Sequence, residues 1–493
     1  MEQRPVNAPR ARRGAGGEIY WIAGIFAAVL TAVSGRYGYH RDELYFLAAG
    51  RRLAWGYPDQ PPLVPLLARA MSAIDPNSVM LLRLPATLAA TVVVLCAGLY
   101  ARELGGGRVA QAVAAGSVAS AALLAGAGHT LSTADLDLAI WSMIILVVLR
   151  LLRSSFDPCW WLAVGVLAGI GVQNKALIVV PLAALALSLL AVGPREIFAT
   201  KYFPLALVIA ALISAPYLLW QARNGWPQWT LSRAIAGGSS GSSNTRIQFV
   251  VLQFGLIGVF LVPLWVFGLW WLWQRYRAFA LTYAVLFLAY LIMVGKAYYL
   301  GEMYPLLLAA GAVGAEPWLV ARRIRLATLS FAIVLNAAFS AVVFLPTLPM
   351  SVLRNPSPIL AINKEAGETV GWPHFVAQIA DVRAHSAPDA DILTANYGEA
   401  AAIEHYGARY DLPTPHSVHN AYWWWGPPAD THAALVVGIP ADQVARFCAD
   451  PEPLARIDNG LNIHNNEQGR ALTLCRTPRH PWRDMWPAMR RLG

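Results

Sequence analysis

Carboxylate side chains that could do acid–base chemistry stand at a few places in the first third of the chain. Asp42 and Glu43 lie in the string RDELYF, and Asp59 lies in the string GYPDQPPL. Asp135 and Asp137 are two residues apart, so on one helix they would face roughly opposite sides. A carboxylate can take the proton of an attacking hydroxyl group, which is the task of a general base.

Cationic and phenolic side chains that could hold a phosphate group follow later in the chain. Lys175 and Lys296 each come at the end of an apolar stretch, and Tyr298 or Tyr299 could donate to phosphate oxygens. Arg51 is a further candidate for this task. Each lysine could instead extend its ammonium group to a membrane surface, and the tyrosines could belong to an aromatic belt.

The composition indicates a protein that is largely embedded in a membrane. Hydrophobic residues make up 57% of the chain and charged residues 13%, whereas a soluble domain has roughly 25% charged residues. Fifteen of the 28 acidic residues follow Pro346, so a soluble region comes after an apolar body. The net charge of +10 does not indicate a nucleic-acid partner, because most Lys and Arg residues stand in short turns between apolar segments.

The apolar segments predict a membrane topology. A spanning helix needs ~20 mostly apolar residues, and we predict about eleven spans, at 19–35, 79–100, 109–126, 132–150, 160–174, 176–193, 202–220, 247–271, 278–295, 303–320 and 326–346. Alternate connections are basic, which places them in the cytoplasm.

The predicted topology is that of a multi-pass protein of the plasma (inner) membrane, and it divides the chain into three regions. It predicts a basic cytoplasmic N-terminus at 1–18, a transmembrane domain at 19–346 with an outer loop at 36–78, and an extracytoplasmic domain at 347–493. In an alternative interpretation, residues 1–34 are a cleaved signal peptide.

The region after Pro346 mixes two patterns, which predicts a small α/β domain. Residues 375–385 and 440–448 have helical spacing, and 392–394 and 434–438 are β-prone. Cys448 and Cys475 share this region, and an oxidising compartment would permit a disulfide between them. His416 and His419 stand beside three tryptophans at 423–425, which is compatible with a metal site, a sugar-stacking surface or a domain core.

Several strings, in order, resemble those of one family. They are RDELYF and GYPDQPPL, Ser132-Thr133 with the two aspartates, Asn174-Lys175, NGWP at 224–227, and GKAYY at 295–299 with Tyr304-Pro305. Over roughly residues 30–320 they look like the polyprenyl-phosphate-dependent membrane glycosyltransferases, which are related to protein O-mannosyltransferases and to the aminoarabinose transferases of lipid A. The resemblance implies the glycosyltransferase C fold, a mostly α polytopic bundle. At Asp59-Gln60 the chain departs from the aminoarabinose enzymes, which have Glu-Lys there.

The resemblance implies a hexosyl- or pentosyltransferase. It would move a monosaccharide from a polyprenyl-phosphate carrier in the lipid bilayer to an envelope lipid, glycan or protein on the extracytoplasmic face, and a single displacement would invert the anomeric carbon. Asp42 is then the base, and Glu43 orients the loop. Asp137 fits the family pattern better than Asp135, which we expect to cap its helix. By analogy with some relatives, Asp59 could bind a divalent metal cation, and no other cofactor is implied.

Two functions of other classes compete with this one. A lipid or sugar transporter or flippase places ionisable groups near mid-bilayer, often in repeated halves. Here the acids cluster at the predicted outer boundary and the sequence contains no internal repeat that we recognise. A non-catalytic scaffold would leave Asp42 and Lys175 without a role.

Overall fold

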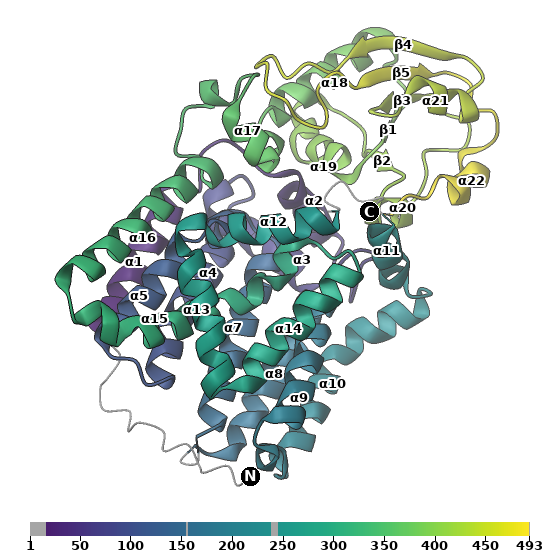
Figure 1. Cartoon of the computed structure of the whole chain (residues 1–493). Coiled ribbons are helices and arrows are strands. Elements are labelled where there is room, and N and C mark those ends of the chain that lie inside the picture. The colour runs from purple at the N-terminus through teal and green to yellow at the C-terminus, as the bar shows by residue number, and fades with distance from the viewer. Residues whose placement is uncertain (1–15, 154–155, 238–244, 493) are drawn as a thin grey trace. The chain divides into compact units, whose positions relative to one another are not determined.

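The computed structural model describes residues 16–153, 156–237 and 245–492, so the predicted basic N-terminus lies outside the described residues up to residue 15. The described chain forms two compact units. The helical unit contains residues 16–34, 83–219 and 245–345, and the mixed unit contains residues 35–82, 220–237 and 346–492. The mixed unit therefore combines the predicted outer loop with the region after Pro346 (Figure 1).

The helical unit consists of apolar helices joined by short turns. Its helices are α1 (Gly17–Val33), α4 (Val79–Glu103), α5 (Arg108–Ser120), α6 (Ala122–His129), α7 (Thr133–Leu151), α8 (Trp161–Asn174), α9 (Val179–Val192), α10 (Tyr202–Arg223), α12 (Arg246–Ile257), α13 (Val262–Arg275), α14 (Arg277–Ile292), α15 (Tyr304–Val320) and α16 (Arg323–Phe344). Short 3-10 helices are η1 (Pro158–Trp160), η2 (Ala176–Ile178), η3 (Arg195–Phe198), η4 (Val259–Leu261) and η5 (Ala297–Met303).

Each predicted span coincides with a helix or with two consecutive helices, but the number eleven is not confirmed. By length and apolar composition, four segments of the described chain could cross a membrane, namely α4, α10, α16 and Ala297–Val320. The number rises to six if the bent pairs α5–α6 (61°) and α12–α13 (83°) each form one span. Helices α1, α9 and α14 are shorter, and α7 contains Asp135, Asp137 and Arg150.

Both bends are held by one buried side chain of α16. The Asn336 Nδ2 atom donates to the Ser120 carbonyl at the end of α5, at 2.9 Å, and to the Ile257 carbonyl at the end of α12, at 3.1 Å. These carbonyls have lost their partners within the helix, and lipid offers none. Gly258 follows with a φ of 97°, and a Cβ there would meet the Asn336 side chain. Only glycine fits this position.

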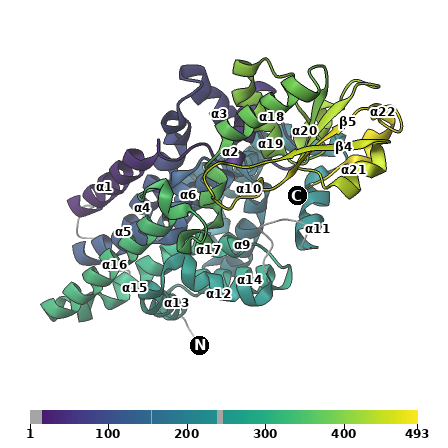
Figure 2. The ribbon, with the colours of Figure 1, turned by 90° about the horizontal axis from the view of Figure 1, so that it is seen from above.

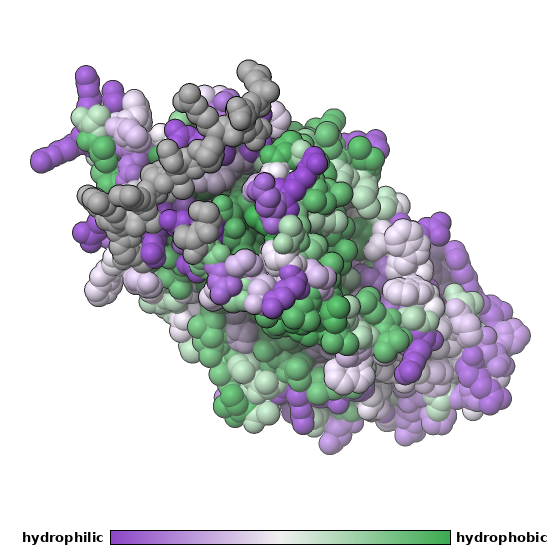
Figure 3. All heavy atoms as spheres, turned by 90° about the horizontal axis from the view of Figure 1, so that it is seen from below, coloured by the Kyte–Doolittle hydropathy of each residue, from purple (hydrophilic) through white to green (hydrophobic). Residues whose placement is uncertain are grey.

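Two helices of this unit carry apolar side chains on their outer surface. Leu205 and Leu212 of α10, and Phe331 and Val334 of α16, are exposed. In the space-filling view, hydrophobic side chains cover broad areas of the face shown (Figure 3). Water penalises such a surface, whereas lipid tails do not. These helices are therefore suited to contact with a bilayer.

The mixed unit contains short helices and a five-stranded sheet. Its helices are α2 (Arg41–Arg51), α3 (Leu63–Ile74), α11 (Pro227–Ala236), η6 (Met350–Leu353), α17 (Pro358–Ile362), η7 (Lys364–Thr369), α18 (Trp372–Ser386), α19 (Tyr397–Tyr406), η8 (Gly407–Tyr410), α20 (Ala421–Trp425), α21 (Ala441–Phe447), α22 (Trp482–Met485) and η9 (Trp486–Met489). Its strands are β1 (Asp391–Thr394), β2 (His416–Ser417), β3 (Ala434–Val437), β4 (Pro451–Arg456) and β5 (Ala471–Cys475).

The sheet has the strand order β2-β1-β3-β5-β4 (Figure 1). Its paired strands β4 and β5 are seen from above in Figure 2. Strand β1 is parallel to β2 and β3, whereas β5 is antiparallel to β3 and β4. Ala434 and Val436 alternate along β3 and pack with Val444 and Phe447 of α21. A disulfide joins Cys448, just after α21, to Cys475 of β5, with Cα atoms 5.7 Å apart. The prediction of a mostly α protein with a small C-terminal sheet is confirmed.

Candidate active site

Helix α2 begins at Arg41 because its first turn is capped by side chains. The Glu43 Oε2 atom accepts from the His40 backbone N–H at 2.8 Å, and the His40 Nδ1 atom accepts from the Asp42 backbone N–H at 3.2 Å. This reciprocal arrangement satisfies N–H groups that have no partner within the helix. Glu43 is fully buried in this cap, which fits a role in orienting the loop.

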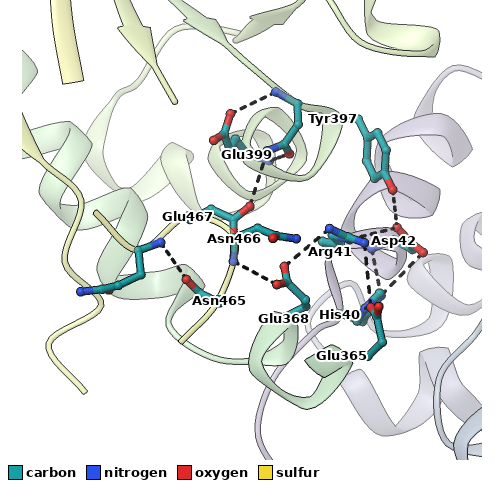
Figure 4. Close-up of polar contacts among 12 residues, drawn as sticks. His40, Arg41, Asp42, Glu365, Glu368, Tyr397, Glu399, Asn465, Asn466 and Glu467 are labelled. Carbon is teal, nitrogen blue, oxygen red and sulfur yellow. Dashed lines mark hydrogen bonds and ion pairs between the residues drawn. The ribbon is translucent and has the colours of Figure 1, made fainter. Parts of the chain in front are cut away.

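Asp42 projects from the same turn and meets a residue more than 350 positions away in the sequence. The Tyr397 hydroxyl, at the start of α19, donates to Asp42 Oδ1 at 2.7 Å (Figure 4). The second oxygen, Oδ2, lies 3.8 Å from His40 Nδ1. The Asp42 side chain is 37% exposed, so it can exchange protons with a bound molecule.

The residues before Asp42 are held by carboxylates of η7. The Glu365 Oε2 atom lies 3.0 Å from His40 Nε2, and the Glu368 Oε2 atom lies 3.8 Å from Arg41 Nη1 (Figure 4). Burial alone would lower the pKa of His40, but the hydrogen bond to Glu365 and the charge of Asp42 outweigh it and raise this pKa. The first turn of α2 is therefore fixed by ionic contacts.

Two further carboxylates of the mixed unit, Glu467 and Glu399, are buried. Burial raises the pKa of Glu467 to about 7 and that of Glu399 to about 8. The Glu399 Oε2 atom accepts from the backbone N–H groups of Ala395 and Asn396, at 2.9 and 3.1 Å, and this caps α19. Near neutral pH Glu399 is therefore mostly protonated and Glu467 is partly protonated, because their charged forms are poorly solvated.

Asp59 is half-buried and already accepts two hydrogen bonds. Its Oδ1 atom accepts from the Tyr45 hydroxyl at 2.8 Å, and its Oδ2 atom accepts from Asn420 Nδ2 at 3.2 Å. Burial raises its pKa to about 7, although both hydrogen bonds act against this. Among the described residues no group of three or more His, Cys, Asp or Glu side chains could hold a metal ion. The surroundings of Asp59 therefore do not fit a metal site.

Arg51 is paired with a carboxylate rather than standing alone. Its Nη1 atom lies 3.4 Å from Glu404 Oε1, and Arg52 Nη1 lies 2.8 Å from the same oxygen. The Tyr422 hydroxyl donates to Glu404 Oε2 at 2.9 Å, and the Arg52 guanidinium lies 4.4 Å from the centre of the Trp425 ring.

In the helical unit, the structure brings together four of the predicted site residues. The Lys175 Nζ atom lies 3.1 Å from Asp137 Oδ2, and the Asp137 side chain is only 2% exposed. The same ammonium group lies 5.3 Å from the ring centre of Tyr298 and 4.7 Å from that of Tyr299. Asp135 instead accepts from the Ser132 backbone N–H and hydroxyl and so caps α7, as expected.

Two further residues at these sites, Glu302 and Tyr397, were not predicted from the sequence. Glu302 is 5% exposed, and its electrostatic neighbours include both Asp137 and Lys175. The sequence could have indicated Glu302, because placing a carboxylate in an apolar stretch costs free energy and therefore suggests a function. Tyr397 had no such signal, since its contact with Asp42 exists only in the folded chain.

The remaining candidates are Lys296, His416 and His419. Lys296 precedes η5 and is half-buried. The His416 Nδ1 atom contacts the Gly426 carbonyl at 2.9 Å, and the His419 ring lies 4.9 Å from that of Tyr397. The two histidines therefore have structural contacts within the mixed unit. Asp42, Glu43, Arg51 and Asp59 belong to the mixed unit, and Asp135, Asp137, Lys175, Lys296, Tyr298 and Tyr299 belong to the helical unit.

Comparison with known proteins gives one family match and several similar structures. A family model described as dolichyl-phosphate-mannose-protein mannosyltransferase matches residues 59–220. No curated protein sequence matches the chain. The apo structure of ArnT from Cupriavidus metallidurans is similar with a TM-score of 0.61 at 14% identity, over 97% of this chain and 99% of that chain.

Two further structures have the same fold. ArnT from Cupriavidus metallidurans bound to undecaprenyl phosphate has a TM-score of 0.56 at 15% identity, over 94% of this chain and 98% of that chain. A variant of the arabinofuranosyltransferase AftD from mycobacteria has a TM-score of 0.50 at 14% identity, over 89% of this chain and 39% of that chain. With the family match, these findings confirm the predicted resemblance: the chain is similar to the polyprenyl-phosphate-dependent membrane glycosyltransferases and has their glycosyltransferase C fold.

Proposed function

We propose that the protein is a membrane glycosyltransferase that moves a monosaccharide from a polyprenyl-phosphate carrier to an envelope lipid, glycan or protein. The family match over residues 59–220 carries this proposal, because the family is described by its use of a lipid-phosphate sugar donor. The similar fold of ArnT, which has been solved with undecaprenyl phosphate, supports a carrier of the same class.

The proposed reaction is one displacement at the anomeric carbon of the donor sugar. The acceptor oxygen forms a bond to this carbon while the bond from the carbon to the phosphate oxygen breaks. The electron pair leaves with the polyprenyl phosphate, the acceptor proton passes to a base, and the configuration at the carbon inverts. Phosphate leaves readily, so the reaction does not require a second carboxyl group as an acid.

Asp42 is the base in this proposal. Its carboxylate is partly exposed, one oxygen is fixed by the Tyr397 hydroxyl, and its helix turn is capped by Glu43. A fixed carboxylate loses less entropy when it meets the acceptor hydroxyl.

Lys175 binds the donor phosphate in this proposal. It is a cation at the end of α8 whose side chain is 15% exposed, with two tyrosine rings around its ammonium group. Asp137 orients it through their ion pair. In a site from which water is excluded, one cation stabilises the departing phosphate strongly. The predicted orientation, with a cytoplasmic N-terminus and chemistry on the extracytoplasmic face, is part of the same proposal.

The test uses the full chain reconstituted in vesicles with synthetic polyprenyl-phosphate monosaccharides whose sugar is labelled. Envelope lipids, glycans and proteins are added as acceptors. We expect label to move to one acceptor class with release of polyprenyl phosphate. Label that crosses the vesicle membrane while it stays on the carrier would identify a transporter and refute the proposal.

Two variants of the same outer loop test the base. Asp42→Asn should lower the transfer rate by about 10²–10⁴-fold, as loss of a general base does. Asp75→Asn is the matched control, because Asp75 is an exposed acid of the same loop that only accepts from the Asn77 backbone N–H. Near-normal turnover of folded Asp42→Asn protein would pass the role to Asp59 or Asp137.

A further inference from the structure

Three consecutive residues at the start of α2 are each held by a side chain from the C-terminal part of the mixed unit. His40 meets Glu365, Arg41 meets Glu368, and Asp42 meets Tyr397 (Figure 4). The first two contacts fix the backbone turn. The third is different, because it reaches the carboxylate to which the proposed reaction assigns the proton.

Tyr397 is itself held in place from several directions. It is the first residue of α19, whose start is fixed by the Asn396 and Glu399 capping box. Its ring lies 4.7 Å from that of Tyr45 and 4.9 Å from that of His419. Burial, followed by the charge of Asp42, raises the pKa of Tyr397 well above its usual value. The phenol therefore keeps its proton and can donate to Asp42.

A donor that is fixed in this way determines where the carboxylate points. The hydroxyl occupies Oδ1, at 2.7 Å, and so directs the other oxygen, Oδ2, away from Tyr397. A bond from a neutral donor to a carboxylate is stronger than one between neutral groups, which makes it able to select one rotamer of Asp42. A misplacement of about 1 Å at a reacting group can cost about 10²-fold in rate.

We propose that Tyr397 is a positioning residue for the base Asp42, so that the C-terminal region takes part in the transfer reaction itself. This inference rests on the proposed function and on Asp42 as its base. Tyr397 touches neither the donor nor the acceptor in this scheme. Its task is to hold Asp42 Oδ1 so that Oδ2 meets the acceptor hydroxyl.

The test compares Tyr397→Phe with a matched loss of a buried hydroxyl. Tyr422→Phe removes a 2.9 Å bond from a tyrosine to a carboxylate in the same unit, but the carboxylate is Glu404. Both variants are measured in the reconstituted transfer assay, and each rate is divided by the amount of polyprenyl phosphate that the preparation binds. This division removes any loss of folded protein from the comparison.

We expect Tyr397→Phe to lower kcat by about 10- to 100-fold while the KM for the lipid donor stays within about twofold. Tyr422→Phe should leave both constants near those of the unchanged protein. Replacement of Tyr397 by 4-aminophenylalanine, which keeps a ring and an N–H donor, should restore most of the rate. A residue that only stabilises the fold would not give this split between kcat and KM or this rescue.

A double-mutant cycle with Asp42→Asn separates failure of this inference from failure of the base assignment. If Tyr397 acts through Asp42, Tyr397→Phe should cause no further loss of rate in the Asp42→Asn background. An inactive Asp42→Asn variant together with a Tyr397→Phe variant of normal kcat would overturn the positioning role and leave the base in place. A fully active Asp42→Asn variant would overturn both. Equal losses from Tyr397→Phe in both backgrounds would also refute the inference.

Discussion

The buried pair of Lys175 and Asp137 allows the structural and functional roles of one cation to be separated. The Lys175→Met substitution removes the charge and keeps most of the apolar stem. It leaves Asp137, which is 2% exposed, without the ammonium group that lies 3.1 Å from its Oδ2 atom. The single substitution should therefore change two things, the stability of the helical unit and the proposed binding of the donor phosphate.

The magnitude of the first effect follows from the distance. At 3.1 Å and an effective dielectric constant of about 20, the attraction between two unit charges is about 5 kcal/mol. Loss of one partner from a buried pair costs about 3–5 kcal/mol, because the other charge stays behind. The double variant Lys175→Met with Asp137→Asn removes both charges, so we expect it to recover most of this loss.

The second effect should not recover in the double variant. A hydrogen bond to a charged group contributes about 1.5–3 kcal/mol, which corresponds to a Kd for polyprenyl phosphate that is about 10- to 150-fold higher. Thermal unfolding in detergent measures stability, and equilibrium binding of labelled polyprenyl phosphate measures affinity. Lys201→Met is the matched control, because Lys201 lies 5.4 Å from the Tyr202 ring centre and is exposed.

Two results would refute this reasoning. If the double variant binds polyprenyl phosphate as tightly as the unchanged protein, Lys175 does not hold the phosphate. If Lys175→Met unfolds at the same temperature as the Lys201→Met control, the ion pair does not support the helical unit. A stable double variant with weak binding is the expected outcome.

Three further predictions concern the mixed unit and the topology. Folding raises the pKa of Glu399 from 4.5 to about 8. Between these pH values the folded state binds more protons than the unfolded state. The free energy of unfolding should therefore fall as the pH rises from about 4.5 to 8. In the Glu399→Gln variant, the unfolding temperature should depend less on pH over this range. An unchanged pH dependence would contradict the prediction. Cys448→Ser should lower the unfolding free energy of the mixed unit by about 3 kcal/mol, and reduction of the unchanged protein should have the same effect. In a background without Cys96 and Cys159, an impermeant thiol reagent should label Ser351→Cys but not Glu196→Cys in intact cells; the reverse pattern would invert the predicted topology.

The apolar helices could be predicted from the sequence because their signal is local. Stretches such as 79–100 and 326–346 coincide with α4 and α16 within a few residues. Their bends could not be predicted in the same way. The break at Gly258 depends on Asn336, which lies on another helix and donates to two helix ends. Such a bond connects distant parts of the chain, and no sequence window contains it.

The sheet shows the same limit. The strands β1 and β3 lie where the sequence is β-prone, at 392–394 and 434–438, because their side chains are buried. Strand β4 contains Pro451 and Pro453, which disfavour a strand. It is nevertheless the edge strand of the sheet, where a missing backbone N–H need not disrupt a second ladder. The edge position of β4, rather than its amino-acid composition, allows this segment to form a strand.

The carboxylates of Asp42 and Asp59, both in the predicted outer loop, could not be ranked by their chemistry from the sequence. Their hydrogen-bond partners in the structure distinguish them. A pKa of about 7 would suit Asp59 for proton transfer near neutral pH. However, each of its oxygens already accepts a hydrogen bond, from Tyr45 and from Asn420. To act as a base, Asp59 would have to take the proton on an oxygen that already accepts one hydrogen bond, and a hydrogen bond to the charged form makes that oxygen a weaker base. Asp42 keeps one oxygen outside its bond with Tyr397 and is 37% exposed, so that oxygen can meet an acceptor hydroxyl without sharing it with the Tyr397 bond. The geometry therefore favours Asp42 as the base and gives Asp59 the task of fixing the loop.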